Sequence, residues 1–544
     1  MGAATVVSDS GAGDVWDTRG TPPATTAGQA RLAGVLAALV ALAVGELLSG
    51  FAGSDQSLIG SVGTSFIDRF AASLKDIAVQ AFGTSDKAAL LIGIVLTSVV
   101  LGAIIGSVAR TRPIVGPLAF AGFGLLGLVC GWTDPQTNKV MVAVAAVGAA
   151  GAGIVTLRLL FRVSQGRPIM PPGPEMDGYD TTLDAAGARR AFLRWSGGAA
   201  AFALVTTLMG RTFAGRSKAE VARETIKLPT VTRNLPNAGT VPDIATGVDV
   251  EGISPYYVAN ASFYRIDTAL VVPQVDPADW KLQITGMVDR PYSLTFDELL
   301  ALPQVEEAVT LQCVSNDVGG DLVGNARWQG VPLKAILDKA GVQAGATQIV
   351  GKSVDGWTAG FPTDVALDGR IAMVAVGMNR ELLPITHGFP ARLVVSGLYG
   401  YVSATKWLSE IRLTTWEDFD GYWVPRGWSK KGPIKTESRI DVPRLGEKLK
   451  AGPQKIAGIA LAPSRGISKV EVQIGDGPWQ QARLGKTVSN NTWVQWVLDW
   501  DATPGEHVIQ VRATDGTGET QTSDLAPPAP DGATGWHRNQ VTVS

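Results

Sequence analysis

Long apolar runs dominate the first two-fifths of the chain and give way to short alternating runs after about residue 211. A helix needs about 20 apolar residues to cross the hydrocarbon core of a bilayer. Five stretches are long enough and predict transmembrane helices at 32–50, 88–108, 114–132, 140–161 and 191–210. We therefore expect a cytoplasmic tail at 1–30 and a membrane domain at 31–211.

The segment 57–83 is moderately apolar but carries four charged residues, so we interpret it as interfacial or re-entrant. Counting it as a sixth span would reverse the topology of everything that follows. With five spans, the arginine-rich loops all fall on one side, which the positive-inside rule assigns to the cytoplasm. The flanking arginines are Arg31, Arg110, Arg112, Arg158, Arg162, Arg167, Arg189, Arg190 and Arg194. The remainder of the chain is then a soluble head outside the cytoplasmic membrane.

The string RRAFLRW at 189–195 directly precedes the last apolar run. It resembles a twin-arginine export signal, which carries folded proteins across a membrane and suits a domain that receives its cofactor in the cytoplasm. The alternative is that these arginines only anchor the helix on the positive side. The predicted spans contain no histidine, because the first in the chain is His387, and this excludes an intramembrane haem held by two histidines.

The head begins after a predicted linker at 212–245 and mixes two periodicities. Residues 280–288 and 391–398 have the pattern of strands, whereas 293–302 and 332–341 show helical spacing of apolar residues. Frequent Gly and Pro between these runs indicate an α+β domain, which we place at 246–450. No GxGxxG or Walker string is present, so nucleotide binding has little support.

The last part of the chain, 451–544, alternates apolar and polar positions between turn signals such as GDG, TPG and DGTG. This pattern predicts an immunoglobulin-like β-sandwich. The charge of the whole chain is balanced, with 47 basic and 49 acidic residues and no basic stripe. We therefore expect no nucleic-acid partner.

Cys313 is one of only two cysteines and lies at the end of a strand-like run in TLQCVSN. The other, Cys130, falls inside a predicted span, so the two do not form a disulfide framework. A lone thiol in an exported domain indicates a reactive group or a soft metal ligand. The alternative is a small buried apolar residue.

Five strings in the head occur together in a specific order: ASFYRIDTALVVPQVD, TLQCVSN, ARWQGVPL, THGFPARLVV and GYVSATKWL. Over residues 250–544 the chain resembles the sulfite oxidase family of molybdenum-cofactor enzymes. The resemblance implies an α+β molybdopterin domain followed by an immunoglobulin-like dimerisation domain, and hence a homodimer through residues 451–544. It also implies a molybdenum–molybdopterin cofactor, and we expect no haem in this chain.

The resemblance assigns roles to individual residues. Cys313 is expected to supply the protein thiolate on molybdenum, a soft donor that must be deprotonated to bind. His387, Arg392 and Lys406 match positions that contact the pterin or its phosphate, and Asp355 matches a pterin-binding aspartate. Phe263 and Arg265 lie in the FYRID string, in which Arg265 matches an arginine near metal and substrate. Taken singly, these polar residues would be read as exposed loop and turn residues.

The chain departs from sulfite-oxidising members at two places. Asp317 and Val318 stand where those members carry arginines after the cysteine, and Trp428 stands where they carry a tyrosine. Fewer cations disfavour a dianionic substrate, so we expect reduction of a sulfoxide or N-oxide and count Trp428 with Cys313 and Arg265 as catalytic. Sulfite oxidation, with Arg265 and Arg426 compensating, is the alternative, and a cofactor-free membrane-tethered sensor or adhesion protein is another. A separate electron-transfer partner, such as a quinone or a cytochrome, is also expected.

Overall fold

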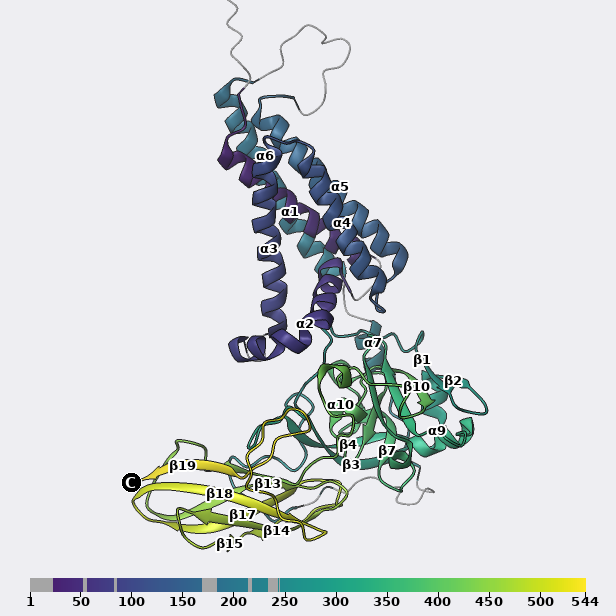
Figure 1. Ribbon diagram of the computed structural model, residues 1–544, viewed down its shortest axis with the longest axis vertical. Coiled ribbons are helices and arrows are strands. Elements are labelled where there is room, and N and C mark those ends of the chain that lie inside the picture. The colour runs from purple at the N-terminus through teal and green to yellow at the C-terminus, as the bar shows by residue number, and fades with distance from the viewer. Residues whose placement is uncertain are drawn as a thin grey trace, which may run out of the picture.

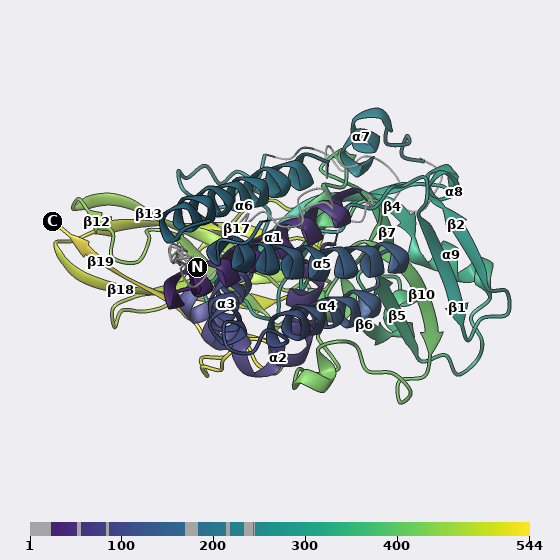
Figure 2. The ribbon, with the colours of Figure 1, turned by 90° about the horizontal axis from the view of Figure 1, so that it is seen from above.

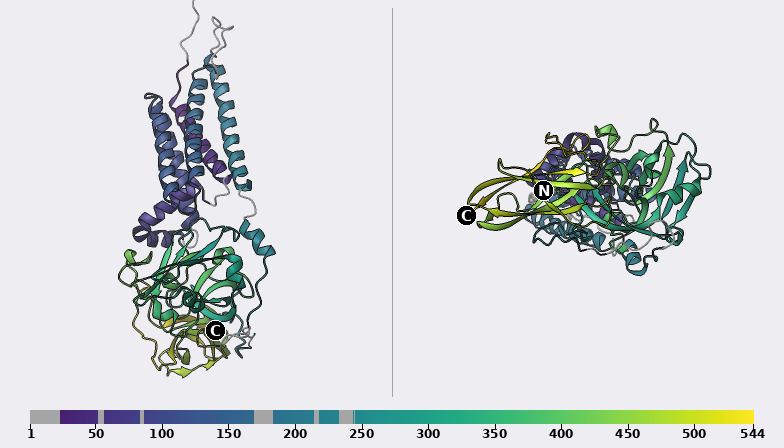
Figure 3. Two further views of the ribbon diagram at one scale, coloured as in Figure 1. Left: turned by 90° about the vertical axis from the view of Figure 1, so that its right-hand side faces the viewer. Right: turned by 90° about the horizontal axis from the view of Figure 1, so that it is seen from below.

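The computed structural model describes residues 23–51, 56–82, 86–168, 183–213, 218–232, 243 and 245–544. Most of the predicted tail at 1–30 lies outside these residues, as do 214–217, 233–242 and 244 of the predicted linker at 212–245. Long helices form an elongated bundle at one end of the molecule, and the strands form a head at the other end (Figure 1). Figure 3 shows the same division from the side, with the carboxyl terminus in the head.

Five helices of the bundle are long and apolar enough to cross a membrane, which agrees with the five predicted spans. Their bounds are α1 (Ala27–Phe51), α3 (Asp86–Ala109), α4 (Val115–Thr133), α5 (Lys139–Ser164) and α6 (Ala185–Phe213). Helix α1 packs against α3, α5 and α6, and Figure 2 shows the bundle from above, with α5 and α6 seen obliquely. A Cβ added at Gly34 of α1 would lie 1.9 Å from the Gly102 oxygen of α3, so small residues allow this close packing.

The segment expected to be interfacial or re-entrant forms one helix, α2 (Leu58–Phe82), which is not among the five apolar helices. It contacts the head at two places. Gly63 packs against Leu270, since a Cβ at this glycine would lie 2.3 Å from Leu270 Cδ2. Further along the helix, Tyr422 Oη donates to Asp68 Oδ1 at 2.8 Å, and Arg426 Nη2 donates to the Asp68 carbonyl at 3.0 Å.

The first part of the head contains two five-stranded sheets over a shared hydrophobic core. One sheet has the order β2-β1-β10-β5-β6, with β1 and β10 parallel. The other has the order β3-β4-β7-β8, and β9 pairs with β7. The strands are β1 (Lys281–Gly286), β2 (Tyr292–Thr295), β3 (Val305–Gln312), β4 (Val323–Pro332), β5 (Gln348–Ser353), β6 (Thr358–Pro362), β7 (Ala372–Met378), β8 (Glu381–Leu382), β9 (Arg392–Val395) and β10 (Leu408–Thr414).

Short helices complete this part: α7 (Lys218–Thr225), α8 (Phe296–Ala301), α9 (Leu333–Ala340) and α10 (Gly400–Ser403). The helix predicted at 293–302 is shorter than expected, because residues 292–295 belong to strand β2. Thr295 accepts a hydrogen bond from the Glu298 amide, and the Glu298 carboxylate accepts one from the Thr295 amide. This capping box fixes the start of α8 at Phe296.

The carboxyl-terminal part is rich in strands and forms two sheets, β11-β13-β17-β16 and β12-β19-β18-β14-β15, with a hydrophobic core between them. Its strands are β11 (Glu437–Val442), β12 (Lys448–Leu449), β13 (Gly452–Leu461), β14 (Ile467–Ile474), β15 (Gln480–Gln481), β16 (Arg483–Leu484), β17 (Val494–Ala502), β18 (Gly505–Asp515) and β19 (His537–Val543). Strands β11 and β12 precede the predicted boundary at 451 and pair within these sheets. The predicted domain limits and the immunoglobulin-like class stay predictions.

Candidate active site

Cys313 directly follows strand β3 and is buried, with 8% of its surface exposed. Its amide donates to the Leu322 carbonyl at 2.9 Å, which fixes the loop that begins there. The Ser315 amide donates to Cys313 Sγ at 3.4 Å. A backbone N–H aimed at sulfur stabilises the thiolate over the thiol, so the loop suits a deprotonated cysteine.

Glu437 accepts hydrogen bonds from residues on both sides of Cys313. Asn316 Nδ2 donates to Glu437 Oε1 at 3.0 Å, and Gln312 Nε2 also donates to this carboxylate. Burial raises the pKa of Glu437 to about 7, although the charge of Arg439 lowers it. Glu437 was not predicted from the sequence; it is 121 residues from Asn316 and belongs to the first strand of the carboxyl-terminal part.

His387, Arg392 and Lys406 come together around Gly388. Arg392 Nη1 donates to the His387 carbonyl at 3.1 Å, and Lys406 Nζ donates to the Thr386 carbonyl at 3.2 Å. Gly388 has φ of 108°, and a Cβ there would lie 3.0 Å from Lys406 Cα and 3.2 Å from Arg392 Cβ. Only glycine allows this backbone conformation and this close approach without strain.

These three side chains are largely buried, and two of them, Arg392 and Lys406, are basic. Burial, together with the charges of Lys406 and Arg392, lowers the pKa of His387 to about 4, so the ring is neutral near pH 7. Burial also lowers the pKa of Arg392 to about 10. Within the described part of the chain, no carboxylate forms a salt bridge with Arg392, whose guanidinium lies 4.9 Å from the Trp328 ring centroid.

Asp267 is the acidic member of this group and joins it to the membrane helices. Its Oδ2 lies 3.1 Å from Lys406 Nζ and 3.0 Å from Arg265 Nε. Its Oδ1 lies 2.6 Å from Lys87 Nζ, at the start of α3, and Lys87 also donates to the Ala269 carbonyl at 2.7 Å. Burial alone would raise the pKa of Asp267, but the charges of Lys406, Lys87 and Arg265 outweigh it and hold this pKa well below its usual range.

Aromatic residues form another wall of the site. Phe263 is edge-on to His387, with ring centroids 5.6 Å apart, and edge-on to Trp328 at 5.8 Å. Tyr264 stacks on Phe263 at 5.2 Å, and burial raises the pKa of its phenol, with a further rise from the charge of Cys313. Tyr264 was not predicted from the sequence, although it lies between two predicted site residues.

Asp355 lies in the turn between β5 and β6, and Trp428 lies in the segment between β10 and β11. Asp355 Oδ1 accepts from the Trp357 amide at 3.0 Å, and burial raises the Asp355 pKa. The following Gly356 faces the loop between α4 and α5, because its Cβ would lie 3.0 Å from Pro135 Cγ. Trp428 packs against Tyr401 at 5.9 Å and Trp423 at 6.3 Å, in a cluster that also holds Val314, the neighbour of Cys313.

Comparison with known proteins places these residues in a family. The oxidoreductase molybdopterin binding domain matches residues 269–423, a range that contains Cys313, Asp355, His387, Arg392 and Lys406. The uncharacterized oxidoreductase YuiH of Bacillus subtilis is 34% identical over 180 residues, which cover 33% of this chain and 87% of YuiH. The chain belongs to the molybdopterin-binding oxidoreductases of the sulfite oxidase family.

Two further members of the comparison are more distant. The mitochondrial sulfite oxidase of Macaca fascicularis is 27% identical over 326 residues, covering 51% of this chain and 59% of that enzyme. The sulfane dehydrogenase SoxCD of Paracoccus pantotrophus aligns with a TM-score of 0.46 and 22% identity, covering 54% of this chain and 84% of that chain. Phe263, Arg265 and Trp428 lie outside the matched domain range.

The site fits the molybdopterin cofactor that this family binds. A dianionic phosphate needs fixed cationic donors. Arg392 has no salt bridge among the described residues, and the acidic partner of Lys406 there is Asp267. A metal bound through sulfur needs a thiolate, and Cys313 has a backbone donor on its sulfur. The arrangement therefore combines a cysteine sulfur and a separate group of basic side chains in one domain.

Proposed function

We propose that this protein is a membrane-anchored molybdenum oxidoreductase that transfers oxygen atoms, with reduction of a sulfoxide or N-oxide as the favoured direction. Cys313 would be the protein ligand of molybdenum. Arg392, Lys406 and His387 would hold the phosphate and pterin, with Phe263, Arg265 and Asp355 around them. The bound cofactor supplies two-electron chemistry at the metal. Reduction of a sulfoxide consumes two electrons and two protons and yields a sulfide and water.

The observation that carries the proposal is the combination of Cys313 with a buried cation group that lacks enough acidic partners. A cofactor-free sensor or adhesion protein has no use for buried, incompletely paired cations, which cost free energy to maintain. Membership of an oxidoreductase family also contradicts that alternative. Electrons would come from a separate carrier such as a quinone or a cytochrome.

The substrate preference is supported by the charge and the hydrogen-bond partners of four side chains. Asp317 is exposed and acidic, and Trp428 carries no hydroxyl group. Arg426, which the sulfite alternative would use, instead donates to the Tyr422 carbonyl and to the Asp68 carbonyl of α2. Arg265 pairs with Asp267. A sulfite dianion would therefore find few cations free to replace its hydration.

Steady-state kinetics on one molybdenum-replete preparation of the full chain test this preference. With an artificial electron donor or acceptor, kcat/KM for a sulfoxide or N-oxide should exceed kcat/KM for sulfite by at least about tenfold, which is about 1.4 kcal/mol. A preference for sulfite would overturn the substrate proposal and leave the cofactor proposal standing.

We further propose that the head lies outside the cytoplasmic membrane, on the basis of the arginine-rich loops. The RRAFLRW string lies in the first turns of α6 and would then act as an export signal or as an anchor. Reporter fusions after residue 170 and after residue 230 should report opposite sides of the membrane. Fusions that report the same side would show that the number of spans is wrong.

A further inference from the structure

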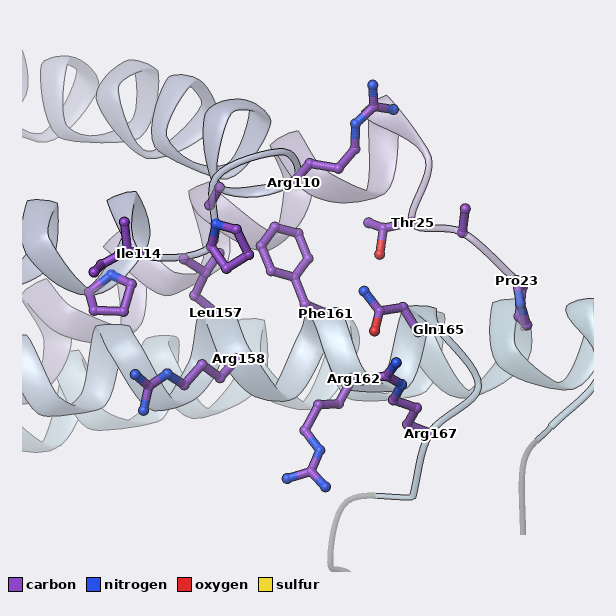
Figure 4. A pocket seen from close by; sticks show the side chains of 14 residues that line it. Pro23, Thr25, Arg110, Ile114, Leu157, Arg158, Phe161, Arg162, Gln165 and Arg167 are labelled. Carbon is purple, nitrogen blue, oxygen red and sulfur yellow. The ribbon is translucent and has the colours of Figure 1, made fainter. Parts of the chain in front are cut away.

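A cavity of about 930 Å³ lies between the helix ends farthest from the head (Figure 4). The end of α3, the start of α4, the last turns of α5 and the residues before α1 surround it. Thr25 Oγ1 and Ser164 Oγ are hydrogen bonded at 2.7 Å and are both buried. This bond joins the segment before α1 to the end of α5 and gives the cavity a fixed side.

Four arginines line this cavity: Arg110, Arg158, Arg162 and Arg167. All four are exposed, and within the described residues none forms a salt bridge or a side-chain hydrogen bond. Basic residues near a membrane surface commonly do no more than orient the protein. These four come from two separate segments that border one cavity, and Figure 4 shows Arg110 on one side of it and Arg158 and Arg162 on the other. The exposed Arg112 is only two positions from Arg110 and does not line it.

Part of the cavity wall is apolar, and exposed apolar residues continue beside it on the outer surface of the bundle. Pro117 and Leu157 line the cavity, together with Ile114, which is 69% exposed. Beside them, Leu118 of α4 and Val155 of α5 are 64% and 63% exposed. Exposed apolar residues on helices of this length are expected to face lipid chains. The cavity therefore has a cationic rim and an apolar side that opens toward the hydrocarbon.

The start of α4 adds to the attraction for an anion. Helix α4 begins at Val115, and Ile114 provides no side-chain cap for its first amides. The amino-terminal end of a helix favours negative charge. The charged rim would suit inorganic phosphate as well as a lipid headgroup. Only a ligand with acyl chains would also contact the apolar part of the wall.

We propose that this cavity binds the phosphate headgroup of an anionic phospholipid, with its acyl chains along the exposed faces of α4 and α5. Basic pockets between transmembrane helices are known to bind such headgroups. The inference does not depend on the activity of the head, because the cavity lies at the end of the bundle farthest from the head.

Native mass spectrometry of the full chain, released from nanodiscs with equal amounts of phosphatidylglycerol and phosphatidylcholine, tests the proposal. We expect wild type to retain phosphatidylglycerol preferentially. Arg158→Gln/Arg162→Gln should lose about fivefold of this preference per arginine, as expected for about 1 kcal/mol per basic residue. Arg112→Gln removes the same charge outside the cavity and should behave as wild type. The single variant Arg110→Gln serves if the double variant does not fold.

Two results would overturn the proposal. Equal loss of preference in Arg112→Gln would show that only the general surface charge matters. Displacement of the retained lipid by millimolar inorganic phosphate would show a site for free anions rather than for a lipid. Retention of the lipid in the presence of millimolar phosphate, together with wild-type behaviour of Arg112→Gln, supports the proposed site.

Discussion

The protein contains two groups of cations that differ in burial. In the head, Arg392 is 4% exposed and has no salt bridge among the described residues, whereas Lys406, with 11% of its side chain exposed, pairs with Asp267. At the far end of the bundle, four exposed arginines surround a cavity with no acidic partner among the described residues. Water can solvate the second group, whereas the first must find its anions inside the protein or in a ligand.

This difference predicts how each group holds a phosphate. Charges that are removed from water interact strongly with a bound anion and are little affected by salt. Exposed charges interact weakly, are screened by salt and exchange their ligands. The head group therefore suits a cofactor that stays bound, and the bundle group suits a lipid that exchanges with the membrane.

The largest effect is expected from Arg392→Met. Losing one partner of a buried charge pair costs about 3–5 kcal/mol, so the pterin content per chain should fall below a tenth of the wild-type value. The same change should raise the melting temperature of cofactor-free protein, because it removes a buried cation with no carboxylate partner. Pterin fluorescence and thermal denaturation measure both effects. Lys334→Met, which breaks the exposed pair with Asp338, is the control and should change neither.

The next largest effect concerns the link to the membrane helices. In Lys87→Met, Asp267 would be balanced only by Lys406 and Arg265 and would compete with the phosphate for Lys406. We expect pterin content to fall about tenfold, equivalent to about 1.4 kcal/mol. Lys87→Met/Asp267→Asn should regain most of this content, because the competing carboxylate is gone. Lys87→Arg should load normally.

The double variant distinguishes two roles for Lys87. If Lys87→Met/Asp267→Asn loads no better than Lys87→Met, Lys87 only holds the head against the bundle. Pterin content of wild type is the reference in both cases, and absence of pterin from wild type would instead contradict the proposed cofactor.

Lys406 should make pterin retention depend on pH, with an effect of similar or smaller size than that of Lys87→Met. Burial lowers its pKa to about 8, although Asp267 raises it. The protonated form pairs with phosphate, so phosphate binding takes up a proton once the pH exceeds this pKa. Pterin retention should be constant below about pH 8 and weaken above it, by up to about tenfold per pH unit. Lys406→Arg stays charged, and its retention from pH 7 to 9 should be flat.

The smallest effect should appear at the bundle. Raising the salt concentration from 50 to 500 mM shortens the screening length severalfold, so the preference for phosphatidylglycerol should decline while pterin content stays constant. Parallel measurements on one preparation check this contrast. If lipid preference and pterin content were equally sensitive to salt, burial would not explain the difference between the two groups of cations.

Local patterns in the sequence predicted the elements that present the site. Apolar runs indicated the five long helices, and the strand-like run before Cys313 is β3. The start of α8 was misplaced because the alternation in 292–295 is too short to separate a strand from a helix, although Thr295 and Glu298 carry the capping signal. The resemblance to the family, which rests on the order of five motifs along the chain, predicted His387, Arg392 and Lys406 as site residues. The structure brings these three residues together.

Partners that are distant in sequence could not be predicted in this way. Lys87 and Asp267 are 180 residues apart, and Glu437 is 121 residues from Asn316. A single sequence does not say which of many charges meet after folding. Asp267 had one local signal, since it stands two positions after Arg265 in the FYRID string, and short spacing of opposite charges permits an ion pair.

X-ray absorption at the molybdenum edge, on full-length wild type and Cys313→Ser, tests the central claim most directly. Serine replaces the thiolate with a harder oxygen, while Arg392, Lys406 and His387 remain to hold the pterin. We predict that the variant retains its pterin, has one sulfur ligand fewer on molybdenum and loses nearly all turnover. The same number of sulfur ligands in both proteins would contradict the assignment of Cys313 as the metal ligand.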